Sequence, residues 1–371
     1  MSRHLRVIID LDAIKNNLNT LRKRLSPEIK IIGVVKANAY GHGALEVSKV
    51  LENSGIDMLA TAYLEEAIAL REAGIRAPII VLFDEPDPQK FLRYDLSAVL
   101  HNRGTLDTLS RILKPSSPPL SVHIKIDTGM GRLGFGPEEI PSLMRKLKEI
   151  NSLKIEGIMS HFSEAELSNK DSARRQIEIF KNVLSEIKEE FGALPLCHMA
   201  NSAASVNLPE ARFSAVRPGL MLYGYLPGLL EERELKPAMK VTTEILNIRE
   251  VPAGTPVSYG GTFITKRKSL IGIISAGYAD GLMRSLSNRG YVLYMGKRAP
   301  VIGRICMDLT MIDLTEIIKS EKRQCKEVIL LGSEERESIS AKDIASLAGT
   351  IPYEVLTTFG GLGKKEFLKN D

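Results

Sequence analysis

Lys36 is the first residue whose position suggests chemistry, because it directly follows the apolar run of residues 31–35. Such a run predicts a buried strand. A lysine at the end of a strand is most often a solvated surface charge. The alternative is a desolvated amine, since burial favours the neutral, nucleophilic form that can attack an aldehyde cofactor.

Four other polar residues hold an equivalent position. Arg132, His161, Ser202 and Arg217 each follow a separate apolar run, as Lys36 does. Residues scattered over a surface at random would not all follow strands. The pattern therefore favours one site to which several strand ends contribute.

The segment Arg-Pro-Gly-Leu at positions 217–220 follows the last of these runs. Gly219 allows close backbone approach, so this segment can bind phosphate through backbone N–H groups. The alternative is an ordinary Pro-Gly turn with a solvated arginine. The shared position of Lys36 and Arg217 favours the phosphate site.

Glycines at positions 129, 131 and 134 match the G-x-G-x-x-G pattern of dinucleotide sites. Pro137 is expected to begin the next helix, which separates the glycines from the helix N-terminus that should hold a pyrophosphate. We therefore reject a nicotinamide-dependent dehydrogenase. The glycines are expected to shape a loop that presents Lys125, Asp127 and Arg132.

A metal site is not expected. His161 is separated from His123 and His198 by whole strands, and no carboxylate completes a ligand pattern, so a hydrogen-bonding role is favoured for His161. The cysteines have no paired spacing, which predicts reduced thiols and no Cys-rich zinc site. They are Cys197, Cys306 and Cys325.

The first two-thirds of the chain alternates apolar β-branched runs with amphipathic stretches. Helical stretches include residues 63–72 and 174–190, and an earlier helix that Asp10 can cap. Eight strand–helix units in about 230 residues predict a (β/α)8 TIM barrel, in which reactive groups gather where strands end. The expected strands are residues 31–35, 58–61, 79–83, 98–100, 120–126, 155–159, 196–199 and 213–216.

After about residue 236 strands follow one another with turns between them, which predicts a mainly antiparallel β domain. The acidic segment 231–234, between Pro-Gly and Lys-Pro dipeptides, predicts domains at 1–235 and 236–371. The expected strands of the second domain are residues 241–249, 269–276, 291–295, 297–305 and 328–331.

The 371 residues are 44% hydrophobic and 26% charged, which excludes a disordered chain. The net charge is +5, and the basic runs lack the interleaved aromatic residues that would stack on bases, so nucleic-acid binding is not expected. The N-terminus lacks a signal-peptide pattern and no apolar stretch of about 18 residues occurs. We expect a cytoplasmic protein that binds no membrane.

Together these segments resemble alanine racemase, a pyridoxal 5'-phosphate enzyme with a barrel followed by a β domain. The similarity runs from Val7 to about Tyr353, and VVKANAYGHG at positions 34–43 is similar to the cofactor-lysine signature of the family. The other matching segments follow in family order: KIDTGMGRLG (125–134), SHF (160–162), NS (201–202), RPG (217–219), SYG (258–260), GYADG (277–281) and CMD (306–308).

The resemblance implies a cofactor site. Lys36 would hold pyridoxal phosphate through its aldehyde carbon, Arg217 would face the pyridine nitrogen, and His161 would hydrogen-bond Arg217. The resemblance assigns the phosphate to Tyr40, Ser202, Gly219, Leu220 and Tyr353.

The resemblance also implies two bases and a homodimer with shared active sites. Lys36 would serve the D-substrate face, and Tyr259 of a partner subunit the L-substrate face. Arg132 and the backbone N–H of Met307 would bind the substrate carboxylate, and Lys125 can be carbamylated in this family to brace the arginine. The implied activity is that of an isomerase that supplies D-alanine for peptidoglycan.

Some alternatives stay open. A serine or broad-specificity racemase is one, because a single hydroxyl changes binding modestly in many pockets. A related pyridoxal-phosphate decarboxylase should lack the motifs around Arg217 and Tyr259, and a non-enzymatic cofactor-binding barrel would not need the second domain. Residues 357–365 depart from the usual arginine- and proline-containing ending of the family. Further supporting residues are Tyr278, Asp280, Arg284, Cys306 and Asp308.

Overall fold

The computed structural model describes residues 4–227, 234–318 and 325–369. Their contacts divide them into two compact units. The barrel unit contains Ile14–Ala39 and Ala44–Leu235, and the β-rich unit contains the segment up to Ala13, Tyr40–Gly43 and the segment from Lys236 onwards. Most of the expected acidic boundary at 231–234 lies outside the described residues, and a domain boundary at 235/236 stays a prediction.

Eight parallel strands close into the predicted barrel, which confirms the fold class. The ring closes where Lys30 and Ile31 pair with Ala215 and Val216. Every residue of the second and fourth barrel strands is buried, as expected for strands covered on both faces. The strands are β2 (Lys30–Val34), β3 (Met58–Thr61), β4 (Ile79–Val81), β5 (Leu96–Leu100), β6 (Leu120–Lys125), β7 (Leu153–Met159), β8 (Leu196–His198) and β9 (Ala215–Val216).

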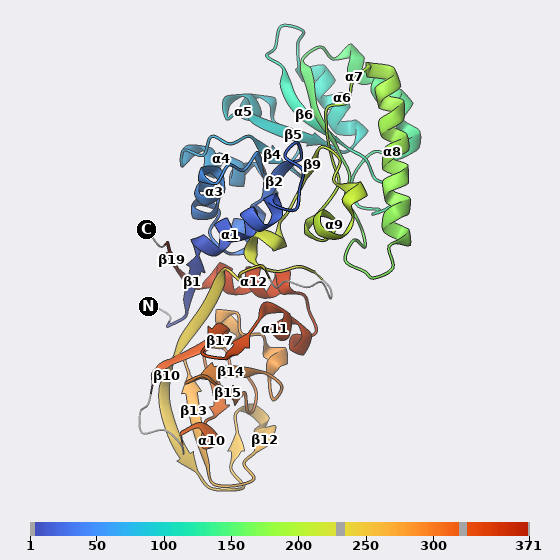
Figure 1. Cartoon of the computed structure of the whole chain (residues 1–371). Coiled ribbons are helices and arrows are strands. Elements are labelled where there is room, and N and C mark those ends of the chain that lie inside the picture. Colours follow the sequence, from blue (N-terminus) through green and yellow to red (C-terminus); the bar gives the residue numbers. More distant parts are fainter. Residues whose placement is uncertain (1–3, 228–233, 319–324, 370–371) are drawn as a thin grey trace. The chain divides into compact units, whose positions relative to one another are not determined.

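Helices lie outside the barrel strands (Figure 1). The longest has the predicted apolar stripe, with Ile177, Phe180 and Ile187 buried. Asp10 Oδ1 accepts the Ala13 N–H at 2.9 Å and caps the first helix as expected. The helices are α1 (Leu11–Arg22), α2 (Lys36–Tyr40), α3 (Ala44–Asn53), α4 (Leu64–Glu72), α5 (Pro88–Arg93), α6 (Arg103–Ile112), α7 (Ile140–Glu149), α8 (Asp171–Phe191) and α9 (Ser202–Asn207), with short 3-10 turns η1 (Pro137–Glu139), η2 (Pro209–Ala211) and η3 (Leu220–Tyr223).

The β-rich unit is built on a mainly antiparallel sheet with the strand order β15-β14-β17-β10-β1-β19. β13 also pairs with β10 and with β16, β18 pairs with β17, and β11 and β12 form a separate pair. The strands are β1 (Arg6–Asp10), β10 (Met239–Val251), β11 (Pro256–Val257), β12 (Phe263–Ile264), β13 (Ser269–Ile274), β14 (Tyr291–Tyr294), β15 (Lys297–Pro300), β16 (Thr310–Asp313), β17 (Glu327–Glu334), β18 (Glu337–Ile339) and β19 (Lys364–Leu368).

This sheet differs from the sequence analysis at β1 and at the end of β15, and it also contains β16, β18 and β19, which were not expected. The N-terminal strand β1 pairs antiparallel with β10 and parallel with β19, far from it in sequence. The strand expected at 297–305 ends at Pro300, and the left-handed φ of 76° at Gly303 turns the chain before residue 305. The helices of this unit are α10 (Thr315–Ile318), α11 (Ala341–Ala348) and α12 (Pro352–Leu362), with the turns η4 (Tyr259–Gly261), η5 (Tyr278–Asp280) and η6 (Arg284–Leu286).

None of the helices within the described ranges is long and apolar enough to cross a membrane.

Candidate active site

Three cationic side chains meet at the carboxyl end of the barrel. Lys36 Nζ, Lys125 Nζ and Arg132 Cζ lie 5.2, 5.8 and 5.9 Å from the ring centroid of Phe83. Each distance is within the range of a cation–π interaction. Sequence reasoning identified the three cations and missed Phe83, although this residue is the last one of the strand expected at 79–83 and lies two residues after β4.

The Lys36 amine is partly withdrawn from water at the end of β2. Burial lowers its pKa, the Arg132 guanidinium lowers it further, the Glu66 carboxylate raises it, and Arg217 lowers it. These effects favour the neutral amine more than in a solvated lysine. The structure therefore supports the desolvated amine over a surface charge.

The chain turns in an unexpected way after Lys36. Ala37, Asn38, Ala39 and Tyr40 all have positive φ, between 51° and 54°. L-residues with a Cβ rarely adopt this left-handed region. This left-handed turn precedes Gly41 and Gly43.

Lys125 is more strongly perturbed than Lys36. Burial, with Arg132 and Arg217, lowers its pKa to about 8, against a smaller opposing effect of Asp127. The amine is therefore partly neutral near physiological pH. A neutral amine is the form that can react with carbon dioxide, so this environment is compatible with the expected carbamate.

The loop that carries Arg132 is shaped by its glycines and by Asp127. The glycines at 129, 131 and 134 all have positive φ. Asp127 Oδ1 accepts the N–H groups of Gly129 and Met130 at 2.9 and 2.8 Å. A helical turn begins at Pro137, after the loop, as expected.

Arg217 is a buried cation with neutral hydrogen-bond acceptors around it. Nη1 donates to Nδ1 and to the carbonyl of His198, both at 2.8 Å. Nη2 donates to the Ser160 carbonyl at 2.5 Å and to His161 Nδ1 at 3.2 Å. Burial lowers its pKa to about 9, which leaves the guanidinium charged at neutral pH.

A second histidine follows in the same chain of hydrogen bonds. Because Arg217 can only donate, His198 Nδ1 is the acceptor and Nε2 carries the proton. His198 Nε2 then donates to His123 Nδ1 at 2.9 Å. Sequence reasoning considered both histidines as metal ligands only and missed this role.

Ser202 lies where a phosphate site was expected. Its Oγ accepts the N–H groups of Gly219 and Met221 at 2.9 and 3.2 Å, which leaves the hydroxyl hydrogen available to donate. Leu220 begins the turn η3 beside it. Three of the five expected phosphate residues therefore lie together.

Two more expected phosphate residues lie together in the β-rich unit. The rings of Tyr40 and Tyr353 are 5.7 Å apart between centroids. Burial, and then Tyr353, raise the pKa of Tyr40, so its hydroxyl stays protonated and able to donate.

The remaining expected residues also belong to the β-rich unit, where two of their segments meet. The Tyr278 and Ala279 N–H groups donate to the carbonyls of Cys306 and Met307, both at 3.0 Å. Asp280 Oδ2 accepts the Gly277 N–H at 3.0 Å. Arg284 begins the turn η6, and Asp308 is exposed.

Tyr259 is 69% exposed and lines a cavity of about 790 Å³ together with Ser258 and Cys306. Ser258 holds an unusual φ of 64° immediately before it, and its Oγ donates to the Arg304 carbonyl at 2.5 Å. Tyr259 therefore has an accessible hydroxyl on a structured turn.

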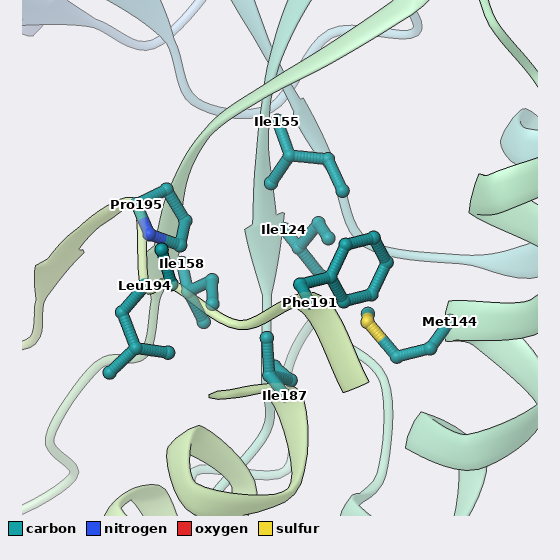
Figure 2. A pocket seen from close by; sticks show the side chains of 9 residues that line it. Ile124, Met144, Ile155, Ile158, Ile187, Phe191, Leu194 and Pro195 are labelled. Atoms are coloured by element: carbon teal, nitrogen blue, oxygen red, sulfur yellow. The ribbon is translucent and has the colours of Figure 1, made fainter. Parts of the chain in front are cut away.

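A different cavity of about 310 Å³ lies against β6 and β7, and Figure 2 shows its apolar lining. Ile155 and Ile158 point into it from β7, Met144 from α7 and Phe191 from α8. No titratable side chain lines it, so it carries no chemistry. Among the residues that the structure describes, no cluster of His, Cys, Asp or Glu side chains could hold a metal ion.

Two family models match this chain. The alanine racemase N-terminal domain matches residues 9–227, and the alanine racemase C-terminal domain matches residues 238–366. This chain belongs to the alanine racemase family. The alanine racemase of Thermodesulfovibrio yellowstonii is 47% identical, over 100% of this chain and 99% of that one. The alanine racemase of Halothermothrix orenii is 42% identical, over 94% of this chain and 92% of that one.

Solved alanine racemase structures have the same fold. The enzyme from E. faecalis superposes with a TM-score of 0.91 at 36% identity, over 99% of this chain and 98% of that one. The Bacillus anthracis enzyme with bound L-Ala-P superposes with a TM-score of 0.89 at 35% identity, over 100% of this chain and 96% of that one.

The barrel residues fit the pyridoxal 5'-phosphate on which the alanine racemase family depends. The Lys36 amine matches an aldehyde, since desolvation favours its nucleophilic form. The buried Arg217 cation matches an unprotonated ring nitrogen, and the Ser202 hydroxyl matches a phosphate oxygen.

Proposed function

We propose that this racemase interconverts L-alanine and D-alanine by moving the α-proton between Lys36 and Tyr259. The observation that carries the proposal is the Lys36 amine at the end of β2, with a lowered pKa and with Arg132 and Lys125 around the same Phe83 ring. An amine of this kind can both bind an aldehyde cofactor and act as a base near neutral pH.

Lys36 would bind pyridoxal phosphate, and Arg217 would face its pyridine nitrogen. The phosphate would be held by Ser202, Gly219, Leu220, Tyr40 and Tyr353. When bound, the cofactor acidifies the α-proton of an attached amino acid by delocalising the electron pair left behind. Arg217 would leave that ring nitrogen unprotonated, because a charged guanidinium can only donate a hydrogen bond and the nitrogen would have to accept it. An unprotonated ring would be a weaker electron sink, which would disfavour transamination.

The neutral histidines near Arg217 support this role. Burial first, and then Arg217, lower the pKa of His198 and His161 well below the usual value. Both rings therefore accept hydrogen bonds from the guanidinium without adding charge. His161 positions Arg217 by the bond between Nδ1 and Nη2.

The substrate carboxylate would be bound by Arg132 and by the Met307 backbone N–H. Lys125, as a carbamate, would hold Arg132, and the change from cation to anion would replace repulsion by attraction. Residues that would support the substrate site from the β-rich unit are Tyr278, Asp280, Arg284, Cys306 and Asp308.

The second base would come from a partner subunit in a homodimer. Tyr259 is exposed on the turn η4, so its hydroxyl is accessible to a neighbouring chain. Tyrosine has a reference pKa of about 10, so this role requires neighbours that stabilise the phenolate. Domains at 1–235 and 236–371 would then contribute Lys36 and Tyr259, respectively. We place the enzyme in the cytoplasm, as a source of D-alanine for peptidoglycan.

Incubation of the pyridoxal-phosphate-loaded enzyme with L-alanine tests the proposal. We expect D-alanine to form until both enantiomers are present equally, and no carbon dioxide to be released. When the incubation is carried out in deuterium oxide, we expect deuterium at the α-carbon. Release of carbon dioxide would identify a decarboxylase instead. A parallel incubation with L-serine measures the preference for alanine.

A further inference from the structure

The left-handed turn after Lys36 needs an explanation, because only one of its four residues, Asn38, favours positive φ. Ala37, Ala39 and Tyr40 have a Cβ and gain nothing from positive φ, and only Asn38 is commonly found there. Such a backbone persists where its surroundings hold it, and it occurs often at active sites. A residue outside the turn is therefore expected to hold it next to Lys36.

Glu66 makes such a contact from another element. It adds to two local bonds, from the Ala39 N–H to the Val35 carbonyl and from the Ala44 N–H to Asn38 Oδ1, both at 2.8 Å. Glu66 Oε1 accepts the Ala37 N–H at 2.7 Å. Its Oε2 accepts the N–H groups of Ala62 and Tyr63 at 2.8 and 3.3 Å. One carboxylate therefore joins the residue after Lys36 to the segment that follows β3.

The charge of Glu66 also acts on Lys36. The other charged groups that act on this amine are Arg132 and Arg217, and both are cationic. Glu66 is the carboxylate that opposes them and raises the pKa of Lys36. The same side chain thus holds the backbone and balances the charge at the amine.

We propose that Glu66 is a positioning residue for Lys36: its carboxylate holds the left-handed turn and thereby aims the amine at the cofactor. The inference rests on the proposed function, in which Lys36 binds pyridoxal phosphate. The simpler explanation is helix capping alone, because Glu66 is the third residue of α4 and accepts the N–H of the cap residue Tyr63.

The two explanations can be separated by side-chain length. Asp343 occupies the equivalent position of α11 and caps it, accepting the Ser340 N–H at 2.8 Å. An aspartate at position 66 should therefore keep the cap and fall short of Ala37. Glu139 provides the matched control, because it caps the turn η1 through the Gly136 N–H at 2.8 Å, and its other oxygen binds exposed Arg103.

The experiment compares Glu66→Asp, Glu139→Asp and wild type. The apoprotein of each is titrated with pyridoxal 5'-phosphate, and the dissociation constant is read from the visible absorbance. The adduct is then reduced and mapped by peptide mass. Loss of one hydrogen bond to a charged group predicts a dissociation constant about tenfold higher for Glu66→Asp, at a nearly unchanged melting temperature of the apoprotein. Glu139→Asp should stay within about twofold of wild type.

Glu66→Gln gives a second, independent measurement. It keeps the side-chain length and removes the charge that raises the pKa of Lys36. In the apoprotein, the pH midpoint for modification of Lys36 by trinitrobenzenesulfonate should therefore fall. Equal dissociation constants for Glu66→Asp and Glu139→Asp, or an unchanged midpoint in Glu66→Gln, would overturn the role of Glu66. Wild-type protein that takes up no cofactor on Lys36 would instead overturn the proposed function.

Discussion

Arg217 Nη1 donates to His198 Nδ1 at 2.8 Å, and this one bond sets the protonation of two buried histidines. It makes His198 Nε2 the donor to His123 Nδ1. Burial, with a smaller effect of Arg217, lowers the pKa of His123 to about 4. The buried cation is thus paired with neutral rings, which accept its hydrogen bonds without repelling it.

The neutral histidines predict a loss of stability in mild acid. In the unfolded chain His123 takes up a proton below pH about 6.5, whereas the native ring stays neutral down to pH about 4. The unfolded state therefore binds more protons in this window, and the free energy of unfolding falls by about 1.4 kcal/mol per pH unit for each such histidine. Urea unfolding at pH 7 and at pH 5 measures this difference in the free energy of unfolding.

The control for that measurement is His123→Gln, which keeps a hydrogen-bond acceptor for His198 and cannot titrate. Glu156 raises and Arg217 lowers the pKa of His123, and both stay in the variant. Between pH 7 and pH 5, the free energy of unfolding of the variant should depend less steeply on pH, because unfolding takes up one proton fewer than in wild type. An equally steep dependence in the variant would contradict a neutral native His123.

Replacing Phe83 should change the pKa of Lys36 in a direction that depends on the substitute. Phe83→Leu keeps apolar volume and loses the ring, so the Lys36 ammonium loses roughly 0.5–1 kcal/mol of stabilisation and its pKa falls. Phe83→Ala admits water and should raise it. The measurement is the pH dependence of Lys36 modification by trinitrobenzenesulfonate in the apoprotein.

Phe91→Leu is the matched control for Phe83, because Phe91 is fully buried on α5. Phe91→Leu should leave unchanged the pH midpoint for modification of Lys36. If Phe83→Leu and Phe83→Ala both raised the midpoint, the ring would serve only to exclude water.

Two adjacent glycines of α12 should respond in opposite ways to alanine. A Cβ on Gly360 would lie 2.2 Å from the Gly41 carbonyl oxygen, whereas a Cβ on Gly361 meets no heavy atom within 4 Å. We expect Gly360→Ala to lower the free energy of unfolding by about 1–3 kcal/mol. Gly361→Ala should raise it by roughly 0.5–1 kcal/mol through helix propensity. Similar melting temperatures for the two variants would refute the close approach.

The barrel and most of its site residues follow from local sequence patterns. Each barrel strand is a short apolar run, and parallel strands place their carboxyl-terminal residues at one end. That rule is enough to bring Lys36, Arg132, His161 and Arg217 together. It holds because burial on both faces of the strands leaves a strong hydrophobic signal.

Other features depend on contacts between distant residues. β1 is predictable only through its pairing with β10 and β19. Ala37, Ala39 and Tyr40 have positive φ against their own preferences, and the Ala37 N–H is bound by Glu66, which lies on another element. Phe83 resembles any other apolar residue until three cations surround its ring.

Subunit mixing tests the proposed homodimer with shared active sites. Lys36→Ala and Tyr259→Phe homodimers should each be nearly inactive, because every site lacks one base. After random exchange half of the dimers are mixed, and each mixed dimer holds one intact site, so activity should return to about a quarter of wild type.

Exchange must be demonstrated independently, for example by co-purification through two affinity tags. If mixed dimers form and no activity returns, Tyr259 serves its own chain, and the shared site is wrong.

The most direct measurement is the identity of the lysine that carries the cofactor. The loaded enzyme is reduced with borohydride, digested, and mapped by mass spectrometry. Lys125 is a real competitor, since its pKa is lowered to about 8 beside the same Phe83 ring. We expect the pyridoxyl group on Lys36, at the end of β2. A pyridoxyl group on Lys125 or on any other lysine would contradict the account.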